Sequence, residues 1–303
     1  MLYIIMLALN HVEVADTFAE AFPMSGARIV ITARTPAWAE TAGREFCGHA
    51  SSVIGCDAEA AVERALSPDQ TPDGRPGISL LAFAFNSQGL AKAVVGRVGQ
   101  NVLTCPTTAC YDGLSPELRT SRISVGGALR YFGDGMQSSK QLGDRRFWRM
   151  PVMDGEFLCE DRFGACDGVG GGNLLLCGAD VDATLAAAEA AAAAIRDVPG
   201  CILPFPGGIV RSGSKVGSRY AKLRASTNDP YCPVIRALTN SSLPEGCQCV
   251  YELVIDGVSF AAVQSAMRAG LHAAGRCEGL LRITAGNYGG KLGKHHFQLR
   301  DLL

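Results

Sequence analysis

The sequence predicts an α+β protein in which one arrangement of strands and helices occurs twice. Asp16-Thr17-Phe18 returns 145 residues later as Asp161-Arg162-Phe163, and an apolar strand around Ile29 returns at the same spacing around Leu174. In both places a helix candidate follows the strand. Motifs that recur in the same order at a constant spacing indicate a duplicated fold.

The elements of the first copy follow from its apolar pattern. Pro36 suits the first turn of a helix, and the turn Pro72-Asp73-Gly74 leads into a continuous apolar run typical of a buried strand. We expect a strand at 28–31, a helix at 36–47, a strand at 78–85, a helix at 88–99 and a strand at 101–105.

The second copy repeats this order. Its alanine-rich stretch is a strong helix former, and Pro244-Glu245-Gly246 takes the place of the earlier Pro-Asp-Gly turn. We expect a strand at 173–176, a helix at 182–196, a strand at 250–255, a helix at 259–275 and a strand at 280–285.

Each half therefore reads strand, helix, strand, strand, helix, strand, which is the order of the ferredoxin-like βαββαβ unit. We expect two such lobes, at 1–150 and 151–303, each a sheet with helices on one face. The second lobe carries a long insertion at 206–244. A loop of this length inside a compact domain is usually functional or disordered.

The bulk charge argues against some partners. The chain of 303 residues has a formal net charge of -1 and only 19% charged residues. This balance argues against a nucleic acid or an anionic membrane bound by charge, and no stretch is long and apolar enough to predict a membrane span. Residues 1–9 are apolar but lack a basic leader and a cleavage site; a first strand, or a true start at Met6, accounts for them.

The twelve cysteines stand among apolar residues, as buried free thiols do, and a chain this long needs no disulfide framework. Cys247 and Cys249 form a C-x-C pair, but no second pair has the spacing of metal ligands. We expect reduced thiols in a cytoplasmic protein and no metal, with a metal site as the minor alternative.

Glu252 interrupts an otherwise apolar strand, Val250 to Ile255. It lies either on an open face of the sheet beside Val250 and Val254, or at a working site, where the cost of burying a carboxylate is tolerated. The second turn motif lies 172 residues after the first, which pairs Glu252 with Leu80. Because only one copy has an acid at this position, the functional interpretation is favoured.

Two glycine-rich segments resemble phosphate-binding loops but depart from them. The cluster at 168–173 precedes a strand, whereas a phosphate cradle follows a strand and opens a helix. The segment at 286–292 follows a strand but has Leu292 where a P-loop needs Ser or Thr. Asn287 and Lys291 can present a donor and a cation there; the alternative is a glycine-rich turn with a solvated lysine.

The insertion brings small hydrogen-bond donors together with Lys215 and other basic residues. This composition suits an elongated polar ligand that carries carboxylates or phosphates, and a solvated loop is the alternative. Cys105, Cys110 and Cys232 have no histidine at a spacing that supports a nucleophile, and a G-x-S-x-G elbow is missing.

Six segments together resemble the family of formylmethanofuran–tetrahydromethanopterin formyltransferases. They occur in collinear order, and the resemblance covers about residues 12–303. The segments are 16–22 (DTFAEAF), 72–77 (PDGRPG), 204–210 (PFPGGIV), 214–218 (SKVGS), 226–229 (STND) and 285–293 (AGNYGGKLG).

The resemblance implies two ferredoxin-like lobes, a homotetramer, and reversible formyl transfer between methanofuran and tetrahydromethanopterin. The two carriers are co-substrates, and neither a tightly bound cofactor nor a covalent formyl-enzyme is implied. Glu252 matches the family's proposed catalytic glutamate. Arg219-Tyr220 and the stretch at 234–243 depart from the family pattern and affect loop details of substrate binding.

Direct transfer in a ternary complex needs positioned substrates, donors for the oxyanion and a group that moves protons. Apolar surroundings raise a carboxyl pKa, so a protonated Glu252 is the expected acid. The expected substrate-binding residues are Asn287, Asn228 and Ser226 near the carbonyl, Lys215 and Lys291 at anionic tails, and Thr227 and Asp229 of the same segment. The alternative is a non-catalytic subunit or scaffold of a formyltransferase/hydrolase complex, because fold does not fix function.

Overall fold

The computed structural model describes residues 7–303. The described residues form two compact units: unit 1 comprises residues 7–23 and 169–303, and unit 2 comprises 24–168. This grouping differs from the expected linear division after Met150, because the strands β3 (Phe18–Thr32) and β11 (Arg162–Gly178) each contribute residues to both units. The expectation for residues 1–6 lies outside the described residues.

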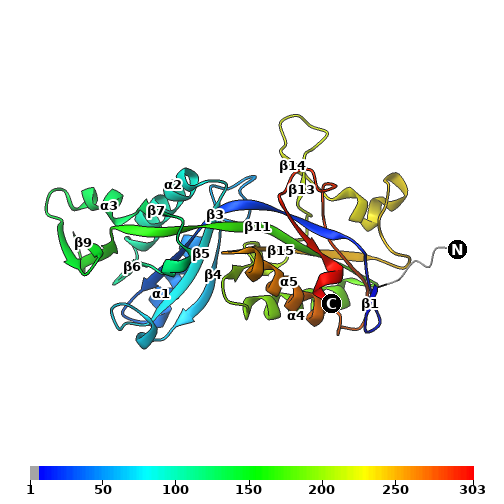
Figure 1. The fold of residues 1–303 in the computed structure, drawn as a ribbon, viewed down its shortest axis with the longest axis horizontal. Helices are drawn as coiled ribbons and strands as arrows, with labels where there is room; N and C mark the ends of the chain where they lie inside the picture. The colour runs from blue at the N-terminus through cyan, green and yellow to red at the C-terminus, as the bar shows by residue number, and fades with distance from the viewer. Residues whose placement is uncertain (1–6) are drawn as a thin grey trace. The chain divides into compact units, whose positions relative to one another are not determined.

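Four strands of unit 2 lie in the order β4-β5-β3-β6, and every neighbouring pair is antiparallel. They are β4 (Glu59–Leu66), β5 (Gly77–Ala84), the 24–32 part of β3 and β6 (Ala109–Asp112). The helices α1 (Pro36–Cys47) and α2 (Ser87–Arg97) pack against them and bury a core that includes Phe46, Leu80 and Leu90 (Figure 1). The α+β class and both helices are confirmed.

The expected strand at 101–105 is wrong. Residues Val98–Val102 continue α2 as a π-helical turn, in which the Leu103 amide donates to the Val98 carbonyl at 2.8 Å. Val102 and Leu103 pack into the core with the helices, and a short apolar run cannot by itself separate a strand from a buried helical turn. The strand follows later, as β6.

The remainder of unit 2 is an extension around the strands β8 to β10. It comprises β7 (Ser121–Ser124), α3 (Gly126–Leu129), β8 (Ser138–Leu142), β9 (Arg145–Val152) and β10 (Gly155–Glu160). β10 pairs in parallel with β6, and β9 and β8 add antiparallel strands beyond it.

Unit 1 has the same strand order. β12 (Cys201–Ile202), β15 (Cys249–Gly257), the unit 1 part of β11 and β16 (Leu280–Thr284) are neighbours in that order, and all pairs are antiparallel. β2 (Val12–Val14) pairs in parallel with β16, and β1 (Leu7–Leu9) pairs with β2. β17 (His295–Gln298) pairs with the start of β3.

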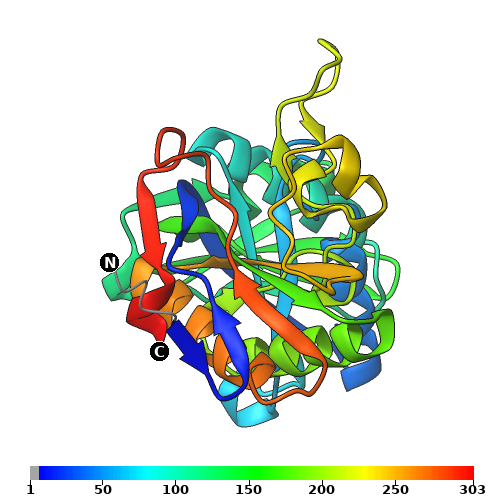
Figure 2. The same cartoon turned by 90° about the vertical axis from the view of Figure 1, so that its right-hand side faces the viewer.

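The helices α4 (Val181–Arg196) and α5 (Phe260–Ala274) cover one side of these strands, as Figure 2 shows. Four alanines of α4 are buried: Ala187, Ala188, Ala191 and Ala192. A Cβ built on Gly270 of α5 would lie 2.7 Å from a methyl of Ile195, so small residues allow the two helices to approach closely. Asp180 and Ser259 cap the helices by accepting from the amides of Ala183 and Ala262.

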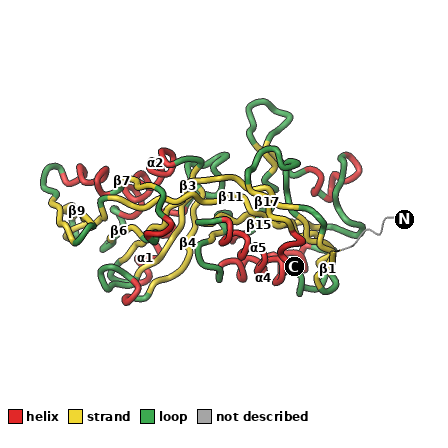
Figure 3. Tube along the Cα trace, viewed as in Figure 1, coloured by secondary structure: helices red, strands yellow, loops and turns green. Residues whose placement is uncertain are grey.

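The insertion at 206–244 lies on the other side of these strands from α4 and α5 (Figures 1 and 2). Figure 3 shows it as mostly loop. It contains a two-residue hairpin, β13 (Lys215–Val216) with β14 (Ala225–Ser226), and the short 3-10 turns Pro206–Gly208, Asp229–Tyr231 and Pro233–Leu238. The structure describes the insertion throughout.

No helix among residues 7–303 is long and apolar enough to cross a membrane. The twelve cysteines all lie in the described part of the chain and are free thiols, seven of them buried. Free thiols were expected.

A pair of glycine substitutions tests the packing of unit 2. Gly126→Ala should lower the free energy of unfolding by about 2 kcal/mol, because its Cβ would lie 2.4 Å from the Glu160 carbonyl oxygen. Gly96→Ala should raise it by about 1 kcal/mol, since Gly96 is exposed in α2 with no atom within 4 Å of the added Cβ. Denaturant unfolding measures both; equal effects would contradict the close contact at Gly126.

Candidate active site

Glu252 lies in the middle of β15 and points away from α4 and α5. Leu253 and Ile255 belong to the core under the helices, so strand alternation places Glu252 on the other face with Val250 and Val254. That face is not open, because Glu252 is only 3% exposed. The insertion covers it.

The expected pairing of Glu252 with Leu80 is wrong by one residue. In β3 and β5 Val30 stands opposite Ser79, and in β11 and β15 Leu175 stands opposite Glu252. Val30 and Leu175 are 145 residues apart, so Glu252 corresponds to Ser79. A shift of one residue exchanges the two faces of a strand. Both copies therefore have a polar residue here, and Ser79 donates to Glu63 at 2.7 Å.

Glu252 has few polar partners. The Ser214 hydroxyl donates to its Oε1 at 2.6 Å, while its Oε2 is buried and accepts no hydrogen bond within the described structure. Burial raises the pKa of Glu252 from 4.5 to about 7, against the opposing effect of the hydrogen bonds from Ser214. The carboxyl group can therefore gain and lose a proton near neutral pH.

The insertion reaches Glu252 through its backbone. Val210 exchanges two hydrogen bonds with Glu252, at 2.7 and 3.0 Å, as an isolated β-bridge. A hollow of about 510 Å³ opens beside this bridge. Its lining residues are Phe205, Pro206, Ile209, Val210, Arg211 and Ser212.

Tyr288 connects the glycine-rich loop after β16 to the insertion. Its hydroxyl donates to the Ser214 carbonyl and accepts from the Val216 amide, both at 3.2 Å. The charge of Glu252 contributes to the raised pKa of Tyr288, although burial is the larger cause. The residue that contacts Glu252 is therefore held by a side chain from a distant part of the sequence.

Glu20 fills the loop that resembled a phosphate cradle. Its carboxylate accepts from the amides of Tyr288, Gly290, Leu292 and Gly293 at 2.6 to 2.9 Å. Burial raises the pKa of Glu20, but these four donors lower it more, so the net shift is downward. Successive amides that converge on one anion form a nest, and here the anion belongs to the chain itself.

The structure brings several expected substrate-binding residues together. Lys215 forms an ion pair with Asp229, and Ser226 pairs with Lys215 across the β13–β14 hairpin. Asn228 lies against Gly213: a Cβ added to Gly213 would be 2.7 Å from the Cβ of Asn228. Thr227 is exposed and lies 3.1 Å from the Cys232 sulfur. Lys215 directly follows Ser214, so this group adjoins Glu252.

The two expected residues of the glycine-rich loop differ in their surroundings. The Asn287 amide donates to the Thr17 hydroxyl and the Phe18 carbonyl, both at 3.1 Å, and its oxygen accepts from Gly289. These bonds attach the loop to the start of β3. Lys291 is exposed in the same loop.

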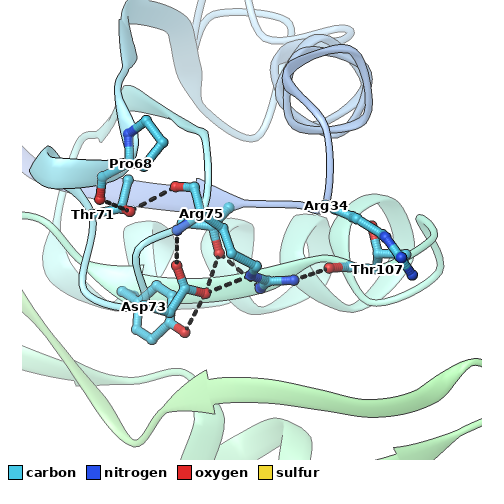
Figure 4. Close-up of polar contacts among 8 residues, drawn as sticks. Arg34, Pro68, Thr71, Asp73, Arg75 and Thr107 are labelled. Atoms are coloured by element: carbon cyan, nitrogen blue, oxygen red, sulfur yellow. Dashed lines mark hydrogen bonds and ion pairs between the residues drawn. The ribbon is translucent and has the colours of Figure 1, made fainter.

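A second polar cluster lies in unit 2, around the turn at 72–77 (Figure 4). Asp73 accepts from Thr32, Tyr111 and Arg75, and Arg75 also donates to the Thr107 carbonyl at 2.6 Å. Burial raises the pKa of Asp73, but its hydrogen-bond donors lower it to a net downward shift. The hydrogen bonds of this cluster attach the turn to the strands β3 and β6. Glu252 differs, because its Oε2 accepts no hydrogen bond within the described residues.

Sequence reasoning missed the roles of Ser214, Tyr288 and Glu20, although each lies in a segment that carried the family resemblance. The available signal was the partial resemblance of the glycine-rich loop at 286–292 to a phosphate-binding loop, which was set aside because Leu292 departs from the P-loop pattern. Among the described residues, no group of three or more His, Cys, Asp or Glu side chains could hold a metal ion.

Comparison with known proteins identifies the class first. Residues 7–152 match the family model for formylmethanofuran-tetrahydromethanopterin formyltransferase, and 155–302 match the model for the proximal lobe of the same enzyme. The fold is thus that of a formyl-transferring enzyme class. The chain belongs to the formylmethanofuran–tetrahydromethanopterin formyltransferase family.

Relatives match along nearly the whole chain. The chain is 55% identical to a component of the formyltransferase/hydrolase complex of Methylorubrum extorquens, with 97% of each covered. It is 50% identical to the formyltransferase of Rhodopirellula baltica, over 98% of this chain and 93% of that one. The formyltransferase of Methanosarcina mazei is 46% identical, over 98% of this chain and 100% of that one.

Two solved structures share the fold. One is the formyltransferase/hydrolase complex from Methylorubrum extorquens in complex with methylofuran, with TM-score 0.94 and 53% identity over 98% of this chain and 99% of that one. The other is the formyltransferase from Methanosarcina barkeri, with TM-score 0.91 and 45% identity over 98% and 100%.

The raised pKa of Glu252 predicts a pH-dependent stability. Between pH 4.5 and about 7 the unfolded chain loses this proton while the folded chain keeps it, so the wild type loses about 3 kcal/mol across this window. Glu252→Gln lacks this loss. The unfolding midpoint of Glu252→Gln, relative to that of the wild type, should therefore rise between pH 5 and pH 8. The midpoint of Glu245→Gln, a variant of an exposed acid, should differ from that of the wild type by the same amount at both pH values. A gap between Glu252→Gln and wild type that is independent of pH would contradict the shift.

The nest around Glu20 predicts a second stability effect. Glu20→Gln should cost about 3 kcal/mol, because an amide oxygen replaces a carboxylate and an NH₂ group faces amide donors. The lowered pKa of Glu20 stabilises the wild type above its unfolded pKa of 4.5, and this stabilisation is lost as the pH falls through the lower folded value. The difference between wild type and variant in urea unfolding should therefore shrink at pH 3; a constant difference would argue against an ionised Glu20.

Proposed function

We propose that this protein catalyses the reversible transfer of a formyl group between methanofuran and tetrahydromethanopterin, by direct transfer in a ternary complex. Family membership over the whole described chain supports the reaction. The observation that carries the mechanism is the buried Glu252, with a pKa of about 7 and an Oε2 that accepts no hydrogen bond within the described residues.

The reaction exchanges one carbon–nitrogen bond for another. The acceptor nitrogen attacks the formyl carbon, a tetrahedral intermediate forms, and the bond to the donor nitrogen breaks. One proton leaves the attacking nitrogen and one reaches the leaving nitrogen, so the net transfer is a single proton from acceptor to donor. Such a sequence needs a group that exchanges protons and donors that stabilise the oxyanion.

Glu252 is the proposed proton-exchanging group. In its neutral form it donates from the otherwise unpartnered side of the carboxyl group, and after donation the carboxylate can accept the proton of the attacking nitrogen. A pKa of about 7 suits both steps, because a catalytic acid and base works best near the pH at which it operates.

The proposed substrate-binding residues are those of the hairpin and the loop near Glu252. Ser226, Thr227 and Asn228 supply donors from the segment that adjoins Gly213, and the Lys215–Asp229 pair orients that segment. Lys291 supplies an exposed cation for an anionic tail. Asn287 acts by holding the loop that carries Lys291.

We also propose that the chain is a tandem of two ferredoxin-like lobes, divided near residue 150. The common antiparallel order of the four central strands in units 1 and 2 supports the duplication. The two family-model matches, which end at 152 and begin at 155, support the division in sequence.

The proposed setting is a cytoplasmic homotetramer that uses the two carriers as co-substrates and holds no tight cofactor or metal. Twelve free thiols suit a reducing compartment. The homotetramer is what the family resemblance implies. Partners like those of the Methylorubrum complex are a further proposal. A purely scaffolding role is not favoured, because relatives are named as formyltransferases.

Glu252→Gln tests the function. With both carriers saturating, the turnover of the purified chain should fall by about a hundredfold or more, because a general acid contributes about 10² to 10⁴, while KM should change little. Glu245→Gln, an exposed acid of the same unit, is the matched control and should keep full activity. Unchanged turnover in Glu252→Gln would exclude the acid role. Transfer activity that requires added proteins would mean that the chain is active only as part of a complex.

A further inference from the structure

The carboxyl group of Glu252 depends on a single side-chain donor. Ser214 is the side chain that donates to it, at 2.6 Å, within the described residues. The neighbours in the sheet, Leu175 on β11 and Val210 in the bridge, have no polar side chain. The backbone amide of Ser214 also hydrogen-bonds to this carboxyl group, so the position of one residue decides how the carboxyl group is oriented and how easily it ionises.

Regular secondary structure does not hold Ser214. It follows Gly213, which has a left-handed φ of 75°, and it precedes the two-residue strand β13. Tyr288 supplies the missing support, since its hydroxyl donates to the Ser214 carbonyl and accepts from the Val216 amide. The Tyr288 hydroxyl thus hydrogen-bonds to the backbone of Ser214, the residue that contacts Glu252, and to the backbone of Val216 two residues later.

Tyr288 is itself fixed by the Glu20 nest. Its amide donates to Glu20 at 2.6 Å, and three further amides of the same loop converge on that carboxylate. Gly293 closes the loop so tightly that an added Cβ would lie 2.4 Å from the Ala21 carbonyl oxygen. The tyrosine therefore connects a loop that four hydrogen bonds attach to Glu20 with a segment outside regular secondary structure.

We propose that Tyr288 is a positioning residue for formyl transfer: through Ser214 it holds the Glu252 carboxyl group in the orientation and protonation balance that the reaction requires. This inference rests on the proposed acid role of Glu252. Its chain of contacts runs from Glu20 to Tyr288, from Tyr288 to Ser214 and from Ser214 to Glu252, all inside unit 1.

The charges around the site give the direction of the effect. Tyr288 is the titratable group that interacts with Glu252, and Glu20 lies behind it. Lys215, the nearest cation in sequence to Ser214, is paired with Asp229. The Ser214 hydroxyl favours the ionised form of Glu252, so a displaced Ser214 raises the pKa of Glu252 above about 7.

Tyr288→Phe is the test, because it removes the hydroxyl and keeps the ring against Phe22. Saturated turnover at pH 7 should fall by about tenfold, since small misplacements of a catalytic group cost up to about a hundredfold. KM for both carriers should stay within about twofold, and the basic limb of the pH profile should move to higher pH. Tyr131→Phe, an exposed tyrosine of unit 2, is the matched control and should change neither.

Infrared titration measures the protonation of Glu252 directly, without a catalytic assay. The carboxylic-acid band that is present in wild type and missing in Glu252→Gln reports the protonated fraction of Glu252, and its midpoint should rise in Tyr288→Phe. Ser214→Ala should raise it too, and Ser214→Thr, which keeps a hydroxyl, should restore it. If Tyr288→Phe does not fold, the two Ser214 variants decide the question.

The outcomes separate this inference from the proposed function. Full turnover in Glu252→Gln would overturn the acid role and, with it, the catalytic meaning of the tyrosine. An inactive Glu252→Gln together with an unchanged pH profile and infrared midpoint in Tyr288→Phe would overturn the positioning role alone. A loss of activity in Tyr288→Phe without any shift in midpoint would also contradict it, because a general loss of structure explains that result.

Discussion

The alternation of side chains along β15 is the constraint from which the rest of the site follows. Leu253 and Ile255 must face the helices to complete the core, so Glu252 must face the other way. Left uncovered, that face would be an ordinary solvated surface with an ordinary carboxylate. The insertion covers it, and the cover turns a strand residue into a buried acid with one free oxygen.

Much of the architecture could be predicted from the sequence because it rests on local patterns. The helix at 36–47 has a proline in its first turn and a regular apolar face, and the structure has the same bounds. The prediction of a strand at 101–105 failed because a short apolar run such as Val102-Leu103 fits a buried strand and a buried helical turn equally well. Tertiary packing favours the helical turn here. The one-residue error in the repeat arose because a turn motif does not fix register, whereas strand pairing does.

The candidate site was predictable in part for the same reason. Glu252 could be found from the sequence because it is the acid in an otherwise apolar strand, Val250 to Ile255. Ser214 and Tyr288 could not be paired from the sequence, since 74 residues separate them and their contact depends on how a loop without periodicity folds. The glycine-rich loop at 286–292 was expected to present the side chains of Asn287 and Lys291, and its backbone amides were not recognised as an anion-binding nest. Its anion, Glu20, lies about 270 residues away and is found only when β3 and the loop are placed side by side.

A pKa of about 7 for Glu252 has a consequence for the direction of formyl transfer. Because burial raises this pKa toward neutrality, both protonation states of Glu252 are accessible near neutral pH. The proposed acid therefore suits formyl transfer in either direction, because the same carboxyl group can give up a proton in one half-reaction and take one up in the other.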